Sequence, residues 1–211
     1  DAGDDTLYGG DGGDVLSELF DPVNSGNDTF DGGNGVDIMY SAAGNDTVSG
    51  GTDAANNYAN LGDGNDTYEG SAGTDVVEGG NDDDTINGNN GDDSLYGDAG
   101  NDKIDGGLGI DLLSGSTGND QLSGGGDNDT LIGGADDDNI VAGGGNDLAA
   151  GDDAAVSIPV GTGISLTGGS GYDSIVGDAG TDLIYGQGGN DTLRGGIGND
   201  TLYGSDGDDH L

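Results

Sequence analysis

Single large apolar residues recur along this chain about every nine residues, separated by polar residues and glycine. Each lies at the centre of a three-residue segment, such as Thr85-Ile86-Asn87, that is followed by a turn-forming loop. This alternation predicts very short β-strands in which only the central side chain points inward. With three slips in phase, the predicted inward residues are Leu7, Leu16, Phe30, Met39, Val48, Tyr68, Val77, Ile86, Leu95, Ile104, Leu113, Leu122, Leu131, Ile140, Ala149, Ile175, Ile184, Leu193, Leu202 and Leu211.

The loops between the predicted strands share the pattern Gly-Gly-x-Gly-x-Asp. Residues 9–17 and 195–203 are clean copies of the full nonapeptide, in which an apolar residue lies two positions after the aspartate. Repeated glycine-rich loops that end in aspartate and are joined by short strands are typical of a calcium-binding parallel β-solenoid. Twenty copies are marked by a sixth-position aspartate: Asp5, Asp14, Asp28, Asp37, Asp46, Asp66, Asp75, Asp84, Asp93, Asp102, Asp111, Asp120, Asp129, Asp138, Asp147, Asp173, Asp182, Asp191, Asp200 and Asp209.

The repeats form a single predicted array over residues 1–211, with interruptions near 17–25, 50–60 and 151–167. We expect an enlarged loop at the first interruption. At the second we expect a worn repeat with a widened loop and no proper ligand aspartate. At the third, segments 156–158 and 164–166 are expected to form strands whose loops bind no metal. Because the first residue lies within a repeat and the last at an apolar position, we expect a fragment of a longer array.

The charge balance is extreme, with 43 Asp and Glu against 2 Lys and Arg and a net charge of −41. With 30% hydrophobic residues, such a chain is expected to be disordered unless a counterion neutralises it. About twenty calcium ions would contribute roughly +40 and leave the filled array near neutral. The charge excludes nucleic acid as a partner. There is no Cys to form disulfides or zinc–thiolate sites, and no apolar stretch approaches the ~20 residues of a membrane span.

These nonapeptides resemble the RTX (repeats-in-toxin) repeats of exported bacterial proteins. The resemblance implies an all-β parallel β-roll, a β-solenoid with 18 residues per turn, about 11 turns and two facing parallel sheets. It also implies roughly one Ca²⁺ per loop, with the twenty aspartates as metal ligands. In loop 79–84 the carbonyls of Gly79 and Asn81 would act with Asp84, and the ion would be shared with loop 97–102. Some substitutions leave the affinity of their loops open: Asp82, Asp127 and Asp136 at the fourth glycine, and Ser41-Ala42 at the first pair.

The outward positions of the predicted strands are uneven. One column of repeats carries mainly threonine and other polar residues, whereas the other carries apolar residues and tyrosines at intervals. This second face could pack against copies of the chain or neighbouring domains, or its residues could simply favour strands. The candidate interface residues are Ile38, Tyr40, Val76, Tyr96, Leu112, Leu148, Leu183 and Tyr185.

Catalysis is not expected, because His210 is the only histidine and no nucleophile has a base beside it. The leading hypothesis is a calcium-binding structural rod of a secreted or cell-surface bacterial protein, folding outside the cell, in a surface layer, extracellular fibre or adhesin. The alternative is the C-terminal export and folding module of a secreted RTX hydrolase or toxin. Ice binding is a third hypothesis, based on a row of outward threonines that fades after Thr85.

Overall fold

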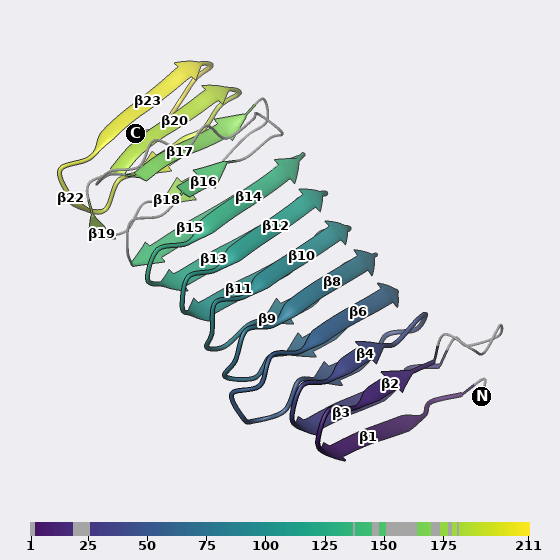
Figure 1. Cartoon of the computed structure of the whole chain (residues 1–211). Helices are drawn as coiled ribbons and strands as arrows, with labels where there is room; N and C mark the ends of the chain where they lie inside the picture. The colour runs from purple at the N-terminus through teal and green to yellow at the C-terminus, as the bar shows by residue number, and fades with distance from the viewer. Residues whose placement is uncertain are drawn as a thin grey trace.

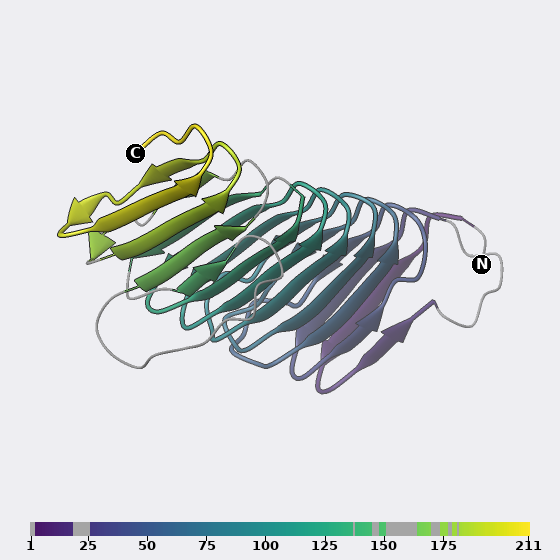
Figure 2. The same cartoon turned by 90° about the horizontal axis from the view of Figure 1, so that it is seen from above.

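The computed structural model shows a stack of short parallel strands that form two facing layers (Figures 1 and 2). It describes residues 3–18, 26–136, 138–144, 148–150, 164–169, 174–176, 179–180 and 182–211. The chain alternates between the two layers as it advances along the stack, and its termini lie at opposite ends (Figure 1). No helix in these ranges is long and apolar enough to cross a membrane.

Two parallel sheets contain all the described strands, and we call them the first and second sheet. The first contains β1 (Thr6–Asp11), β3 (Thr29–Asn34), β5 (Thr47–Ser49), β7 (Thr67–Glu69), β9 (Thr85–Asn87), β11 (Lys103–Leu108), β13 (Gln121–Gly126), β15 (Asn139–Gly144), β18 (Ser174–Val176), β19 (Ala179–Gly180), β21 (Thr192–Arg194) and β22 (Ile197–Gly198). The second contains β2 (Val15–Ser17), β4 (Ile38–Tyr40), β6 (Tyr58–Asp63), β8 (Val76–Asn81), β10 (Ser94–Ala99), β12 (Leu112–Thr117), β14 (Thr130–Ala135), β16 (Leu148–Ala150), β17 (Ile164–Gly169), β20 (Asp182–Gly188) and β23 (Thr201–Asp206).

The strand pairing confirms the predicted all-β parallel solenoid with 18 residues per turn. Leu95 of β10 pairs with Val77 of β8 on one side and with Leu113 of β12 on the other, so identical repeat positions lie in register. The expected count of about 11 turns was too high, because the structure has about 8.

The core consists of two facing files of apolar side chains, one from each sheet, as the nine-residue period predicts. All but four of the predicted inward residues are buried. Leu7 and Leu202 are only partly buried, Leu211 is 64% exposed and follows an isolated bridge rather than a strand, and the side chain of Ala149 lies outside the described set. Ala59 takes the inward position of the worn repeat, between Met39 and Val77.

Many strands are longer than the predicted three residues. β11, for example, continues through Gly106 and Gly107 to Leu108, and Gly107 pairs with Gly125 of the next turn. The first two glycines of a loop therefore still belong to the sheet ladder. Their lack of side chains lets successive turns approach closely: an atom at the Cβ position of Gly107 would overlap the carbonyl oxygen of Asn89.

The interruptions change the step between turns without breaking the stack. Asp5 contacts Asp28 across 23 residues and Asp46 contacts Asp66 across 20, whereas regular partners are 18 apart. Most of the first interruption and the strand predicted at 156–158 lie outside the described residues. The strand predicted at 164–166 is present as the start of β17.

Candidate metal centres

The sixth-position aspartates form two continuous ladders, one along each edge of the solenoid. In each ladder, the backbone N–H of one aspartate donates to the carboxylate Oδ1 of the equivalent residue one turn later. Asp66 donates to Asp84 at 2.8 Å, and Asp84 donates to Asp102 at 2.8 Å. On the opposite edge, Asp93 donates to Asp111 at 2.8 Å. The repeat thus stacks its carboxylates directly above one another.

The second carboxylate oxygen of these aspartates is buried without a hydrogen-bond donor. Leaving a charged acceptor buried and unmet costs free energy, so such atoms call for a positive partner. The Oδ2 atoms concerned include those of Asp14, Asp28, Asp37, Asp46, Asp66, Asp84, Asp93, Asp102, Asp111 and Asp120. Their repetition at both edges indicates a recurrent site rather than a local packing fault.

Backbone oxygen lies beside the unmet carboxylate oxygen at the first glycine of a loop. An atom at the Cβ position of Gly79 would lie 2.5 Å from Asp84 Oδ2 and 2.6 Å from the carbonyl oxygen of Gly97, one turn later. The same two kinds of oxygen surround Gly106, where they belong to Asp111 and Gly124. Hard oxygens from a carboxylate and from carbonyls are the ligands that Ca²⁺ takes. The residues therefore fit a calcium ion, with one carboxylate per loop and carbonyls of successive turns.

The loop backbone keeps one shape even where glycine is replaced. In loop 106–111, Gly107 and Gly109 have φ of 103° and 130°. Asp82, Asp127 and Asp136, which stand at the fourth glycine position, have φ of 74°, 78° and 84°. Aspartate tolerates this left-handed conformation better than most residues. These loops therefore retain the turn, and the same is true of Ala42, at the second position of its loop, with φ of 78°.

Side chains alone do not build a metal cage in the described part of the chain. Within it, no three His, Cys, Asp or Glu side chains come together at one point. A site here has to be completed by carbonyl oxygens, as the glycine-rich loops allow. The arrangement suits a cation that can be bound by many carbonyl oxygens. It does not suit a cation that needs several charged side chains.

Burial makes the ladders electrostatically unstable on their own. Desolvation raises the pKa of Asp84 to about 8, and the neighbouring charges of Asp66 and Asp102 add to this effect, while the N–H of Asp66 opposes it. The same cause raises the pKa of Asp66 and of Asp93 to about 7. Near neutral pH the stacked carboxylates must therefore be protonated, be pulled apart, or be paired with cations.

The structure places most of the predicted ligand aspartates in these ladders, but not all of them. Asp147 and Asp173 lie outside the described residues, and so does the side chain of Asp182. Asp75 is in the ladder, yet both of its carboxylate oxygens accept hydrogen bonds. Asn57, which we did not predict, fills the ladder position between Asp37 and Asp75. The two extra residues of the widened loop hid it from the nine-residue spacing.

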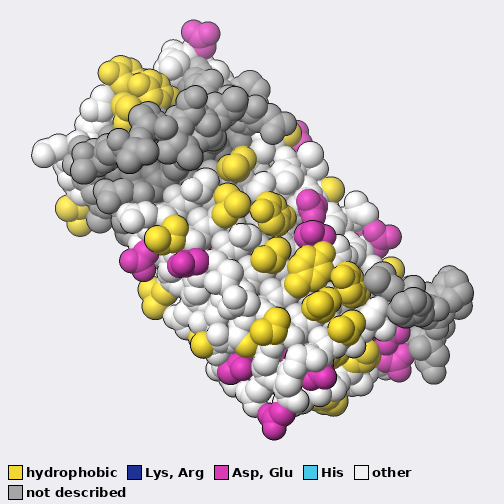
Figure 3. All heavy atoms as spheres, in the orientation of Figure 1, with side chains coloured by type: hydrophobic (Ala, Val, Ile, Leu, Met, Phe, Trp, Pro, Cys, Tyr) yellow, Lys and Arg dark blue, Asp and Glu magenta, His cyan; other side chains and the backbone are white. Residues whose placement is uncertain are grey.

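The outer face of the second sheet carries the candidate interface residues in aligned rows. Ile38, Val76 and Leu112 occupy the same outward position on different turns, and the pairings of β14, β16, β17 and β20 extend the row through the positions of Leu148 and Leu183. Tyr40, Tyr96 and Tyr185 lie in the row two positions further along the strands. Hydrophobic side chains are visible along this side of the molecule in Figure 3.

A parallel solenoid with paired aspartate ladders at its loop edges defines the class of calcium-binding β-rolls. The family model of the RTX calcium-binding nonapeptide repeat matches residues 1–17, 23–48, 52–77, 78–113, 114–149, 165–193 and 185–211. The chain therefore belongs to this family and is a calcium-binding repeat protein. No curated protein matches the chain.

Removal of one ladder carboxylate tests the sites directly. Asp102→Asn should weaken calcium binding, because it removes the charge of the unmet Oδ2 while leaving Oδ1 to accept from Asp84. Isothermal titration calorimetry should show the loss of about one tight ion out of roughly one per loop. The control is Asp105→Asn, which removes the same charge from an exposed position. Equal calcium uptake by the two variants would contradict the ladder as the metal centre.

The direction of the pH dependence should reverse when calcium is added. Burial raises the folded-state pKa of Asp66, Asp84 and Asp93 from 3.8 to about 7 or 8. Without metal, low pH therefore favours the folded solenoid over the unfolded chain. That stability is complete below about pH 4 and is lost as pH rises through these values. In calcium, higher pH should instead strengthen binding, because protons no longer compete. Circular dichroism across pH 4–9, with and without calcium, measures both trends, and parallel trends would contradict this reasoning.

Proposed function

We propose that this chain is a calcium-hardened structural rod of a secreted or cell-surface bacterial protein, which coils only when it meets calcium outside the cell. The observation that supports this most strongly is the double ladder of buried aspartates whose second oxygen lacks a donor. Repeats of this family are typical of secreted proteins. A surface layer, an extracellular fibre or an adhesin would use such a rod as a spacer or scaffold.

The charge explains why the coil would depend on calcium. With a net charge of −41 and only 2 Lys and Arg, the chain has almost no cations of its own to place beside the ladders. Each sheet contributes a core layer only one side chain thick, so burial of apolar surface is modest for the length of chain ordered. Because each site is completed by two successive turns, metal binding and folding become one equilibrium.

A folding switch of this kind suits export. An unfolded polyanion fits a narrow secretion channel, as in type I secretion, and a calcium-poor cytosol keeps it unfolded. Outside the cell, millimolar calcium supplies the missing charge and the solenoid forms. The proposed role is mechanical rather than catalytic, because the aspartates that an enzyme would need as acids or bases already belong to the ladders.

The alternative is a C-terminal export and folding module of a secreted hydrolase or toxin. The same calcium-coupled folding would serve it equally well. A catalytic or pore-forming region in flanking sequence favours the module, whereas further repeats favour the rod.

Calcium-coupled folding is tested by titrating the chain from chelator into millimolar calcium. Far-ultraviolet circular dichroism should change from a coil spectrum to a β-sheet spectrum in a cooperative transition, because each ion requires two formed turns. Magnesium at the same concentration should be much less effective, since it demands a small octahedral site and keeps its water. A β-sheet spectrum that persists in excess chelator at neutral pH would refute the coupling.

Lateral packing through the second sheet is tested at Leu112, in the middle of the apolar row. Leu112→Lys should weaken self-association in calcium, since a charge there would be buried in the contact. Analytical ultracentrifugation measures the association constant. The matched control is Gln121→Lys on the outer face of the first sheet, where the side chain is exposed. If both variants associate like the native chain, this face is not an interface between copies.

A further inference from the structure

Loop 70–75 departs from the metal-binding shape, and it lies one turn after the widened loop 50–57. In loop 70–75, Ser71 and Gly73 occupy the second and fourth positions, yet neither has a positive φ. The equivalent Gly107 and Gly109 of loop 106–111 both do. The backbone of loop 70–75 therefore turns differently, and the N–H of Ser71 points to Asp75 Oδ2 at 2.8 Å.

The carboxylate of Asp75 is fully occupied by hydrogen-bond donors. Its Oδ2 accepts from the Ser71 N–H, and its Oδ1 accepts from the N–H and the side-chain Nδ2 of Asn57 at 3.0 and 3.1 Å. The Ser71 hydroxyl lies 3.4 Å from Oδ1. A carboxylate offers about four lone-pair sites, so these donors meet the need that remains open at Asp84 and Asp93.

Asn57 replaces an aspartate in the ladder without breaking it. Its Oδ1 accepts from the N–H of Asp37 at 3.0 Å, as a carboxylate oxygen does elsewhere. Its Nδ2 has no counterpart in aspartate, and it donates to the carbonyl of Gly50 as well as to Asp75. The amide group thus carries both an acceptor for one turn and donors for the next. It does so without adding a negative charge to the column.

Carbonyls at the first position of three successive loops accept side-chain donors in this region. The Gly50 carbonyl accepts from Asn57, the Leu61 carbonyl accepts from the Ser41 hydroxyl at 2.6 Å, and the Gly70 carbonyl accepts from Asn89 at 2.9 Å. In regular loops the first glycine carbonyl lies beside the unmet carboxylate oxygen of the preceding turn, as Gly97 does at Asp84. Here side-chain N–H and O–H groups donate to these carbonyls, while the Gly88 carbonyl and Asp75 Oδ2 still flank the Cβ position of Gly70.

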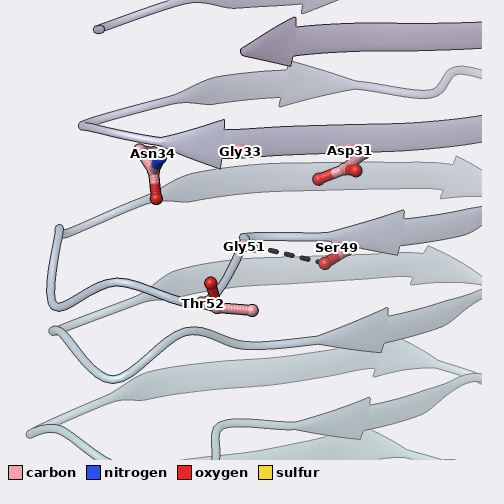
Figure 4. Close-up of a pocket in the computed structure, with 6 residues that line it drawn as sticks. All are labelled: Asp31, Gly33, Asn34, Ser49, Gly51 and Thr52. Atoms are coloured by element: carbon pink, nitrogen blue, oxygen red, sulfur yellow. Dashed lines mark hydrogen bonds between the residues drawn. The ribbon is translucent and has the colours of Figure 1, made fainter. Parts of the chain in front are cut away.

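Large side chains are buried near these loops. Tyr68 is the largest fully buried side chain in the described core, and Leu61 is fully buried at a loop position that is glycine in regular repeats. Beside them, the entry to the widened loop borders a shallow hollow lined by residues of β3 and β5 (Figure 4). There the N–H of Gly51 donates to the Ser49 hydroxyl at 3.2 Å.

We propose that loops 50–57 and 70–75 form a clasp that binds no ion of its own, in which hydrogen bonds from Asn57 and Ser71 to Asp75 take the place of the ion between two turns. The clasp rests on the proposed function, since it is an exception to calcium-coupled folding. It divides one of the two ladders into separate stretches of metal sites. It also holds β5 to β8 together when calcium is scarce, so coiling starts there and spreads to the regular turns.

Hydrogen exchange of the whole chain at a series of free calcium concentrations tests the clasp in its native form. Peptides covering 67–81 should become protected at about tenfold lower calcium than peptides covering 103–126, because hydrogen bonds to a charged group replace the metal. If 67–81 loses protection at the same calcium concentration as 103–126, the clasp is refuted.

A second experiment converts the clasp into a regular loop pair. The double variant Asn57→Asp with Ser71→Gly should bind about one more ion at saturation, measured by equilibrium dialysis. It should also remove the early protection of residues 67–81. The control Asn65→Asp adds the same charge at an exposed loop position and should leave both readouts unchanged.

These outcomes separate the clasp from the proposed function. A folded double variant with the native ion count overturns the clasp, while calcium-coupled folding of the remaining turns stands. Full protection of every peptide in chelator overturns calcium-coupled folding itself, and with it the contrast that defines the clasp.

Discussion

Carboxylates buried one above another at the edges of the coil are the constraint on which the rest of the structure depends. Aspartates such as Asp84 and Asp102 accept the backbone N–H of the previous turn with one oxygen and leave the other without a donor. The hydrogen-bonded half fixes the stacking of the turns. The carboxylate oxygens that lack a donor destabilise the stacked turns unless a cation is present. The raised pKa of Asp84 reflects this effect. Stacking and metal demand are therefore inseparable in the regular loops.

Much of the fold and of the ladders could be predicted, because each residue lies beside the same repeat position of the neighbouring turns. The period of the sequence therefore also gives the long-range contacts. A residue such as Leu113 has its apolar neighbours in the next turns at the same repeat position, so the nine-residue period identifies the core directly. The ladder aspartates follow from the same period. Calcium was expected from the motif, and the family match supports it.

The positions that were missed depend on contacts across turns where the period slips. Asn57 lies two residues out of phase, and only its hydrogen bonds to Asp37 and Asp75 show that it belongs to the ladder. Leu61 stands where regular repeats have the first glycine, so the nine-residue period does not place it in the core, yet its side chain is fully buried. The longer strands were missed because glycine pairs were assigned to loops, although Gly107 pairs with Gly125 in the sheet. In each case the partner is about 18–20 residues away.

The ladders also have a direction. In the ladder pairs of the described residues the earlier aspartate is the donor and the later one is the acceptor, as in Asp66 to Asp84 and Asp84 to Asp102. A cut across the solenoid therefore exposes amide hydrogens on one side and carboxylate oxygens on the other. Two such surfaces complement each other in only one orientation. Coils of this sequence can be joined head to tail with the ladder intact, whereas a head-to-head junction would oppose like groups.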